Sequence, residues 1–215
     1  QIAAAGQREI VLTGVNTGDF GRTTGERFID LLRALVEVEG IDRFRISSIE
    51  PNLLTDEIIA FCAASPKMMH HFHIPLQSGS DRILGLMRRR YTTARFAGRI
   101  AAVRQAIPDA FIGIDVIVGF PGETEADFRA TYDFLAELKP AFLHIFPFSE
   151  RPGTPAVELP GKVQSSVATR RVAELEVLCE RLHGEFCARA VGSEDTVLFE
   201  STRRGGMMFG FTGNY

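Results

Sequence analysis

The chain has 215 residues, of which 45% are hydrophobic and 24% are charged, so it can bury one substantial core. Its formal net charge of −3 excludes bulk attraction to nucleic acid, and any RNA contact must come from local basic patches. No apolar run approaches the ~20 residues that span a bilayer and no signal peptide is visible, so we expect a cytoplasmic protein without membrane contact.

Five short apolar runs alternate with helical patterns between residues 9 and 149. The predicted strands are residues 9–15, 44–50, 70–77, 111–118 and 141–149. Helices are predicted over residues 24–39, from Thr55 to before Pro66, up to Met87, over 92–107, and from Thr124. Each connection is long enough for a right-handed crossover, so the α/β sheet should be parallel, either doubly wound or a barrel-like (β/α) array.

Residues 111–118 form an apolar, β-branched run that predicts a strand buried on both faces. The run breaks at residues 119–122 (GFPG), and Thr124 with Asp127 predicts a capped helix start. Such a loop favours anionic ligands, although an ordinary tight turn has the same composition. A Cβ at Gly119 is expected to cost ~1 kcal/mol unless its φ is positive.

Polar or glycine-rich clusters follow all five predicted strands. They are Asn16, Glu50, Gln77 with Ser78, residues 119–124, and Ser149 with Arg151. Because the carboxyl ends of parallel strands meet at one edge, this pattern predicts a small-molecule site.

The cysteines offer no metal motif. Cys62, Cys179 and Cys187 lie far apart or at helical spacing, without CxxC or CxxxCxxC, and are predicted to be small buried hydrophobes. The run 70–73 contains three histidines, but strand alternation places His71 and His73 on one face and His70 on the other. These histidines are therefore interpreted as structural, and no metal site is predicted within this chain.

After residue 160 the pattern changes. A long helix is predicted over residues 165–191, followed by a strand over 196–200, a polar turn over 203–206 and an apolar run over 207–211. We therefore expect domains at 1–192 and 193–215, the second being the start of a small β module. Both ends resemble interrupted elements, so a fragment is expected, with residues 1–6 as the end of a helix.

Six stretches, in this order, resemble the radical S-adenosylmethionine methylthiotransferases. They are LTGVNTGDFG (12–21), SSIEPNLLTDEII (47–59), HFHIPLQSGSDRIL (71–84), MRRRYT (87–92), GIDVIVGFPGETEADF (113–128) and FSERPGTPA (148–156). GVNTGDFG and SSIEPN are most similar to the branch that acts on threonylcarbamoyladenosine beside the tRNA anticodon. The isopentenyladenosine and ribosomal-protein branches remain alternatives. The closing MMFGFTGNY is similar to part of the family's RNA-binding TRAM barrel.

The resemblance implies a partial (β/α) barrel and a radical reaction. In the family, cluster-bound S-adenosylmethionine is cleaved reductively, and the 5′-deoxyadenosyl radical removes hydrogen from an aromatic C–H. A second 4Fe-4S cluster takes part in sulfur delivery and a second S-adenosylmethionine supplies the methyl group. The family's cluster cysteines lie upstream of this chain's first residue, so this fragment alone is expected to be inactive. Implied partners are tRNA and a reductant protein such as flavodoxin or ferredoxin.

The resemblance also implies contacts for individual residues, while catalytic residues stay unassigned. Cofactor contacts are implied at Gly14, Asn16, Glu50, Gln77, Ser78, Val118, Gly119, Phe120 and Ser149. Substrate or RNA contacts are implied at Arg88, Arg89, Arg90, Arg151, Arg203 and Arg204. Residues 14–16 and Glu50 would hold the methionyl group, 77–78 the ribose or methionyl carboxylate, and 118–120 the adenine, with Ser149 and Arg151 closing the far side.

Structural alternatives stay open for several of these residues. Glu50 would also fit a salt bridge to Arg45 or Arg88, and Gln77 would fit a helix cap. Residues 88–90 suit either a solvated helix end or phosphate contact.

Two other functions compete with the methylthiotransferase. A cluster-independent barrel enzyme such as a lyase or aldolase lacks a Schiff-base lysine at any predicted strand end. A pure RNA-binding protein is opposed by the negative net charge and the incomplete β module.

Overall fold

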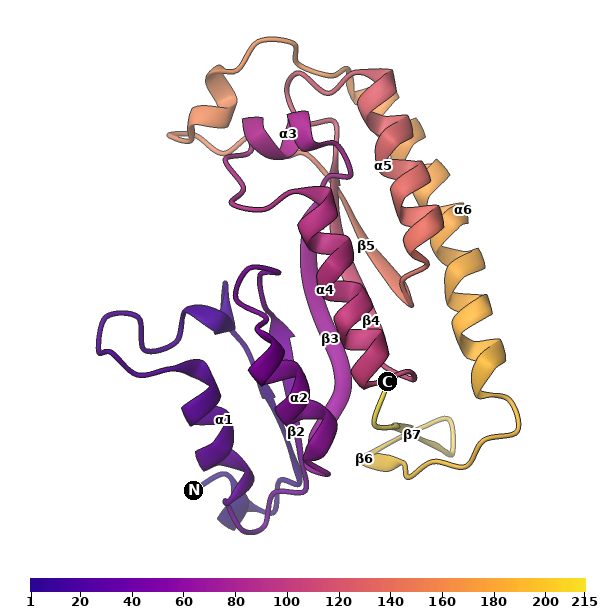
Figure 1. The fold of residues 1–215 in the computed structure, drawn as a ribbon. Helices are drawn as coiled ribbons and strands as arrows, with labels where there is room; N and C mark the ends of the chain where they lie inside the picture. The colour runs from indigo at the N-terminus through magenta and orange to yellow at the C-terminus, as the bar shows by residue number, and fades with distance from the viewer.

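The computed structural model describes all 215 residues and contains one parallel sheet of five strands (Figure 1). The strands are β1 (Glu9–Leu12), β2 (Arg43–Ser48), β3 (Met68–Gln77), β4 (Phe111–Val118) and β5 (Phe142–Pro147). They lie side by side in chain order, and every neighbouring pair is parallel. A doubly wound sheet would reverse its strand order at a switch point. The strand order therefore settles the open alternative in favour of a barrel-like array.

Six α-helices connect or follow these strands. They are α1 (Phe28–Val36), α2 (Asp56–Ala64), α3 (Asp81–Leu86), α4 (Thr93–Ala106), α5 (Glu125–Leu138) and α6 (Ser165–Ala190). Short 3-10 helices are η1 (Ala3–Ala5), η2 (Thr17–Asp19) and η3 (Pro155–Glu158). In Figure 1, α3 lies at the upper end of the molecule, and the loops above α1 and α2 lie lower, at the left. None of the helices combines the length and apolar character needed to cross a bilayer.

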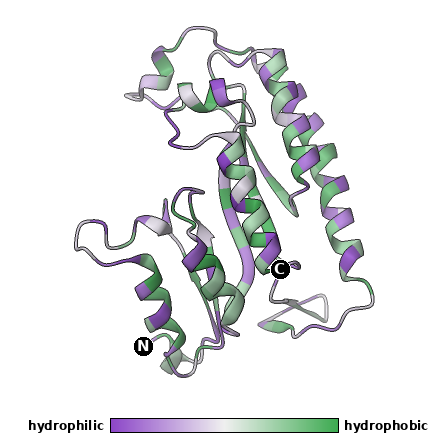
Figure 2. Ribbon diagram, in the orientation of Figure 1, coloured by the Kyte–Doolittle hydropathy of each residue, from purple (hydrophilic) through white to green (hydrophobic).

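The core lies between the sheet and the helices. Phe72, Ile74, Ile112 and Ile114 are at most 1% exposed and belong to a cluster of 33 buried residues that includes side chains of α2, α4, α5 and α6. Alternate residues of the same strands point to the opposite side, which we call the open side of the sheet. Figure 2 shows this as hydrophilic colour interrupting hydrophobic colour along β3. The prediction that residues 111–118 are buried on both faces was correct except at Asp115 and Ile117, which are partly exposed on the open side.

Helix starts follow the predicted chemistry. The Thr124 side chain accepts the Asp127 N–H and the Asp127 carboxylate accepts the Thr124 N–H, which confirms the capping box. Thr55 caps α2 as predicted. Gln77 does not cap α3, because Ser80 accepts the Ile83 N–H there.

Several predicted boundaries were wrong. The helix expected from residue 24 begins at Phe28, because Gly21 and Gly25 have φ values of +74° and +82°, which interrupt helical geometry. The strand expected over 9–15 ends at Leu12, its last residue paired with β2.

The C-terminal segment forms a separate antiparallel hairpin of β6 (Leu198–Arg204) and β7 (Met207–Phe211). Arg203 and Arg204 therefore lie within a strand, and the turn is confined to residues 205–206. Arg43 and Arg45, both buried, fix this segment to β2 by donating to backbone carbonyls of Thr196, Phe211, Thr212 and Gly213. The division at residues 192 and 193 stays a prediction.

Candidate cofactor and substrate cavity

A cavity of about 930 Å³ lies at the carboxyl ends of the strands. The loops after β1 and β2, the end of β3 and the segment after α3 contribute most of its wall. Among its lining residues are the sequence-predicted Asn16, Glu50, Gln77, Arg88, Arg89 and Arg90. The fold therefore brings together six residues that lie up to 74 positions apart in the chain.

The loop after β1 is attached to the end of β2. The Asn16 side-chain oxygen accepts the Glu50 N–H at 3.2 Å, and the Thr17 hydroxyl donates to the Ser48 carbonyl at 2.9 Å. The Asn16 amide also donates to Asp19 at 3.0 Å. These bonds hold the polar ends of two neighbouring strands beside the cavity.

Glu50 forms an ion pair with Arg89, at 3.2 Å between Oε1 and Nη1. The predicted alternatives, Arg45 and Arg88, were the wrong partners. Arg45 pairs with Glu9 at 2.8 Å, next to the C-terminal segment. The Arg89 Nε atom is buried without a hydrogen-bond partner. The Glu50 carboxylate and the Arg89 guanidinium therefore line the same cavity as an ion pair.

At the end of β3, Gln77 lines the cavity, whereas the next residue, Ser78, is buried away from it. Gln77 has a φ of +72°, an uncommon conformation for a residue with a side chain, and it lines the cavity. Ser78 is fully buried, and its hydroxyl lies 3.3 Å from that of Thr131 in α5. A Cβ on Gly79 would lie 2.6 Å from the Thr131 Cα, so this loop approaches α5 very closely. The Ser78 side chain therefore fastens the loop to α5, and because Ser78 lines neither cavity, its predicted ligand contact stays a prediction.

The loop after β4 is held by an internal latch. The Gly119 N–H donates to Glu123 Oε2 at 2.7 Å, and Arg171 of α6 donates to the same oxygen at 2.6 Å. Burial raises the pKa of Glu123, while the Gly119 N–H and Arg171 oppose that rise. Sequence reasoning missed this latch, although the glutamate of the GET motif signals a polar group close to a glycine turn.

Gly119 itself has a φ of +78°, and an added Cβ would lie 3.0 Å from the Ala168 Cβ. Because this φ is positive, a side chain at residue 119 should cost more than the ~1 kcal/mol expected for an ordinary backbone conformation. The turn by itself therefore requires glycine at this position, whether or not a ligand packs against it.

A second cavity of about 320 Å³ adjoins residues 88 and 89. Phe120 lines it and packs edge-to-face against Phe148, with ring centroids 5.1 Å apart. Val118 is fully buried in the core and lines neither cavity, so its predicted adenine contact stays a prediction.

Other predicted contact residues lie outside both cavities. Gly14, Ser149 and Arg151 are exposed and line neither of them. Arg203 and Arg204 are exposed on the β6–β7 hairpin. Their assignments stay predictions.

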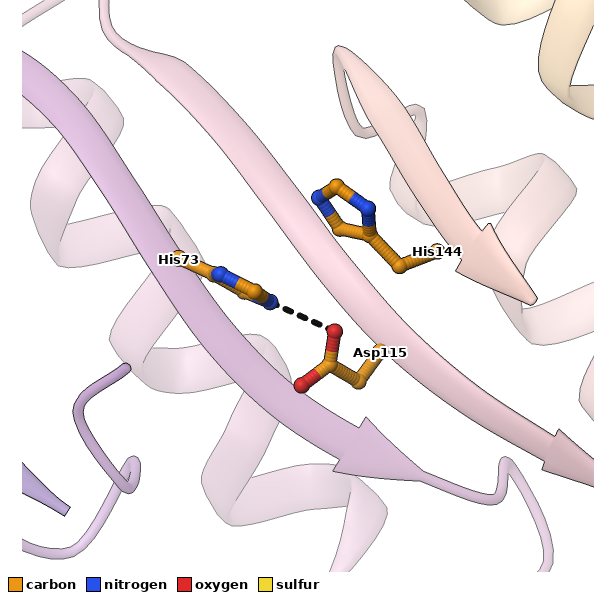
Figure 3. A group of neighbouring side chains, drawn as sticks. All are labelled: His73, Asp115 and His144. Atoms are coloured by element: carbon orange, nitrogen blue, oxygen red, sulfur yellow. Dashed lines mark hydrogen bonds and ion pairs between the residues drawn. The ribbon is translucent and has the colours of Figure 1, made fainter. Parts of the chain in front are cut away.

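The sequence analysis also missed the polar groups on the open side of the sheet. His73 Nε2 and Asp115 Oδ1 are 2.5 Å apart, and His144 lies beside them (Figure 3). Desolvation and the neighbouring His73 lower the pKa of His144 below its usual range. Asp115 also lines the large cavity. The one available signal was an aspartate within the apolar run 111–118.

The cysteines do not form a cluster site. Cys62 is buried in α2, and burial raises its pKa to about 12. Cys179 is also buried, in α6, whereas Cys187 is exposed, so its predicted burial was wrong. No cysteine belongs to a group of three potential metal ligands. This chain therefore offers no grouped thiolates for an iron–sulfur cluster.

The arrangement of five parallel strands around a polar cavity is the fold of radical S-adenosylmethionine enzymes. Coproporphyrinogen III oxidase HemN of Escherichia coli superposes with a TM-score of 0.57 and 16% identity, over 78% of this chain and 38% of that chain. The methyltransferase TsrM of Kitasatospora setae superposes with a TM-score of 0.55 and 17% identity, over 68% of this chain and 27% of that chain.

The radical SAM superfamily model matches residues 1–135, and the chain belongs to this superfamily. Its relatives include the threonylcarbamoyladenosine tRNA methylthiotransferase MtaB of Bacillus subtilis (strain 168), 42% identical over all of this chain and 49% of the relative. The tRNA-2-methylthio-N(6)-dimethylallyladenosine synthase of Thermobifida fusca (strain YX) is 46% identical over 92% of this chain and 40% of the relative. The chain thus spans half or less of these relatives, and their names bear out the resemblance drawn from its motifs.

Proposed function

We propose that this chain forms the cofactor- and substrate-facing part of a radical SAM tRNA methylthiotransferase that acts on threonylcarbamoyladenosine. The observation that carries the proposal is the cavity at the strand ends, which gathers the polar residues of the matching motifs. Similarity to the Bacillus subtilis enzyme over the whole chain supports the branch.

The cavity residues fit the methionyl end of S-adenosylmethionine. Its ammonium group needs acceptors, which Glu50 and Asn16 provide, and its carboxylate needs donors, which Arg89 provides. A volume of about 930 Å³ also leaves room for a nucleoside beside the cofactor. When bound, the cofactor supplies the radical chemistry needed for an unreactive C–H bond. The chain's own residues bind and orient the two reactants.

The cysteines of this chain do not fit either 4Fe-4S cluster, because two are buried apart from each other and none belongs to a group of three potential metal ligands. The isolated 215-residue chain should lack a stable ~400 nm iron–sulfur band after reconstitution, because ligation needs several grouped thiolates. Appearance of that band would contradict the assignment of Cys62, Cys179 and Cys187 as non-ligands.

Contacts to tRNA belong to the same proposal. Arg88 and Arg90 line the cavity mouth beside Arg89, where guanidinium groups suit phosphates next to a modified base. Arg203 and Arg204, with the TRAM-like hairpin that carries them, would contact tRNA farther from the reacting base. The reductant, a flavodoxin or ferredoxin, and the second cluster complete the proposed system.

The second candidate is methylthiolation of dimethylallyladenosine, which the 46% identity to the Thermobifida fusca enzyme favours. The full-length protein should be expressed in a strain without endogenous methylthiotransferases, and its tRNA nucleosides identified by mass spectrometry. We expect methylthiolated threonylcarbamoyladenosine, lost in Glu50→Ala and retained in Glu185→Ala, a control on the exposed side of α6. Accumulation of the dimethylallyl product alone would overturn the branch, and neither product would overturn the function.

A further inference from the structure

Three metal-ligand side chains lie next to one another on the open side of the sheet (Figure 3). His73 comes from β3, Asp115 from β4 and His144 from β5. One donor atom of each lies within 4.8 Å of the donor atoms of the other two. None of the three is a cysteine, and none is among the cofactor or substrate contacts that the resemblance implies.

Strand register explains why these three side chains meet. Asp115 pairs directly with His144, and His73 pairs with Gly113, two residues before Asp115 on the same side of β4. A Cβ on Gly113 would already lie 3.4 Å from His144 Nε2. The His73 and His144 rings lie against each other, with centroids 4.6 Å apart.

A hydrogen bond between the two side chains would by itself explain why His73 and Asp115 lie 2.5 Å apart. It would not account for the His144 imidazole, which makes no hydrogen bond although its ring lies against those of His73 and Phe142. The His73 and Asp115 side chains are 24% and 17% exposed, so an ion can reach them while most of their surface is shielded.

We propose that His73, Asp115 and His144 bind one divalent transition-metal cation of the zinc class. Two imidazole nitrogens and one carboxylate oxygen are the donor set that such ions prefer, and three protein ligands leave a further position for water or a substrate atom. Ligand distances of ~2.0–2.2 Å require donor atoms ~3–3.5 Å apart, so the His73–Asp115 pair has to open by about 1 Å while His144 moves closer. The site rests on these side chains and does not depend on the proposed function.

The test uses the purified 215-residue chain, made metal-free, with Zn²⁺ alone in isothermal titration and Co²⁺ alone in visible absorption. His183 Nε2 and Cys187 Sγ lie 3.6 Å apart and could compete for the ion, so all variants carry Cys187→Ser. We expect one equivalent of Zn²⁺ and visible Co²⁺ bands that Zn²⁺ removes. Asp115→Asn and His144→Gln should each weaken binding at least ~10- to 100-fold, the loss already seen when only a ligand's supporting residue is removed.

His70→Gln is the matched control, because His70 also pairs with an aspartate, Asp109, at 3.1 Å but outside the proposed site. Binding should be unchanged in this variant. Three results would overturn the proposal: no binding of either ion, undiminished binding in His144→Gln, or loss of binding in His70→Gln. Circular dichroism of each variant confirms that it is folded, and His144→Asn replaces His144→Gln if that variant is not.

Discussion

The two sides of the same sheet differ sharply in what they carry. On the helix-covered side, Phe72 and Ile114 are fully buried and belong to the main hydrophobic cluster. On the open side, one residue away in each strand, His73 and Asp115 are partly exposed and bonded to each other. Strand alternation therefore separates the residues that stabilise the fold from the residues that can bind a ligand. Substitutions on the helix-covered side should therefore lower stability, whereas those on the open side should mainly affect ligand binding.

The largest difference in unfolding free energy is expected between Phe72→Ala and His144→Ala. Phe72 is fully buried, so its truncation leaves a cavity and should cost about 3–5 kcal/mol of unfolding free energy. His144 is half-buried and has no hydrogen bond within the chain, so its truncation should cost less than ~1 kcal/mol. Urea unfolding of both variants measures the gap. Equal losses would show that the open side also supports the core.

Arg171 of α6 forms an ion pair with Glu123 and so holds the loop after β4. Its side chain is 4% exposed and that of Glu123 is 1% exposed. Arg171→Met should cost about 3 kcal/mol, because it leaves a buried carboxylate whose main remaining partner is the Gly119 N–H.

The double variant Arg171→Met with Glu123→Gln is the control for that result. It removes both charges and should recover most of the lost stability, as judged from the same urea titrations. If the double variant were as unstable as the single one, the latch would act through packing rather than through charge.

The close approach of the loop after β4 to α6 is tested at Gly119, and Gly153 is the matched control. Both have φ near +80°, but an added Cβ meets Ala168 at 3.0 Å at Gly119 and nothing within 4 Å at Gly153. Gly153→Ala should cost ~1 kcal/mol from backbone strain alone, and Gly119→Ala ~2–3 kcal/mol. Thermal unfolding of the two variants gives the difference. If they lost the same stability, the loop after β4 would be free to shift away from α6.

The sequence predicted the helix-covered side well and the site only in part. Apolar runs and caps such as Thr55 and Thr124 are local signals, so the positions of the five parallel strands and most helices followed from them, whereas the order of the strands in the sheet did not. The ion pair of Glu50 with Arg89 depends on how two connecting segments pack, and the meeting of His73 with His144 depends on strand register; no local pattern contains either. Backbone angles at Gln77 likewise arise from how the loop after β3 meets α5.

The smallest expected effect on stability concerns Asp127 and depends on pH. The Asp127 side chain links the start of α5 to the loop after β3. Burial alone would raise the pKa of its carboxyl, but hydrogen bonds from Arg82, Thr124 and Ser80 hold that pKa well below its usual range. Because the folded-state pKa is depressed, the stabilisation is fully present above the unfolded pKa of ~3.9 and is lost as pH falls below it.

Asp127→Asn removes the charge and keeps the shape of the side chain, so it should cost about 2 kcal/mol at pH 7. At pH 3 the wild type has already lost part of this contribution, so the two proteins should differ less there. Urea unfolding at both pH values gives the two differences. Asp133→Asn, also in α5 and without a hydrogen bond to another side chain, should show no difference at either pH. A constant gap for Asp127→Asn between pH 7 and pH 3 would mean that its hydrogen bonds, rather than its charge, hold the loop.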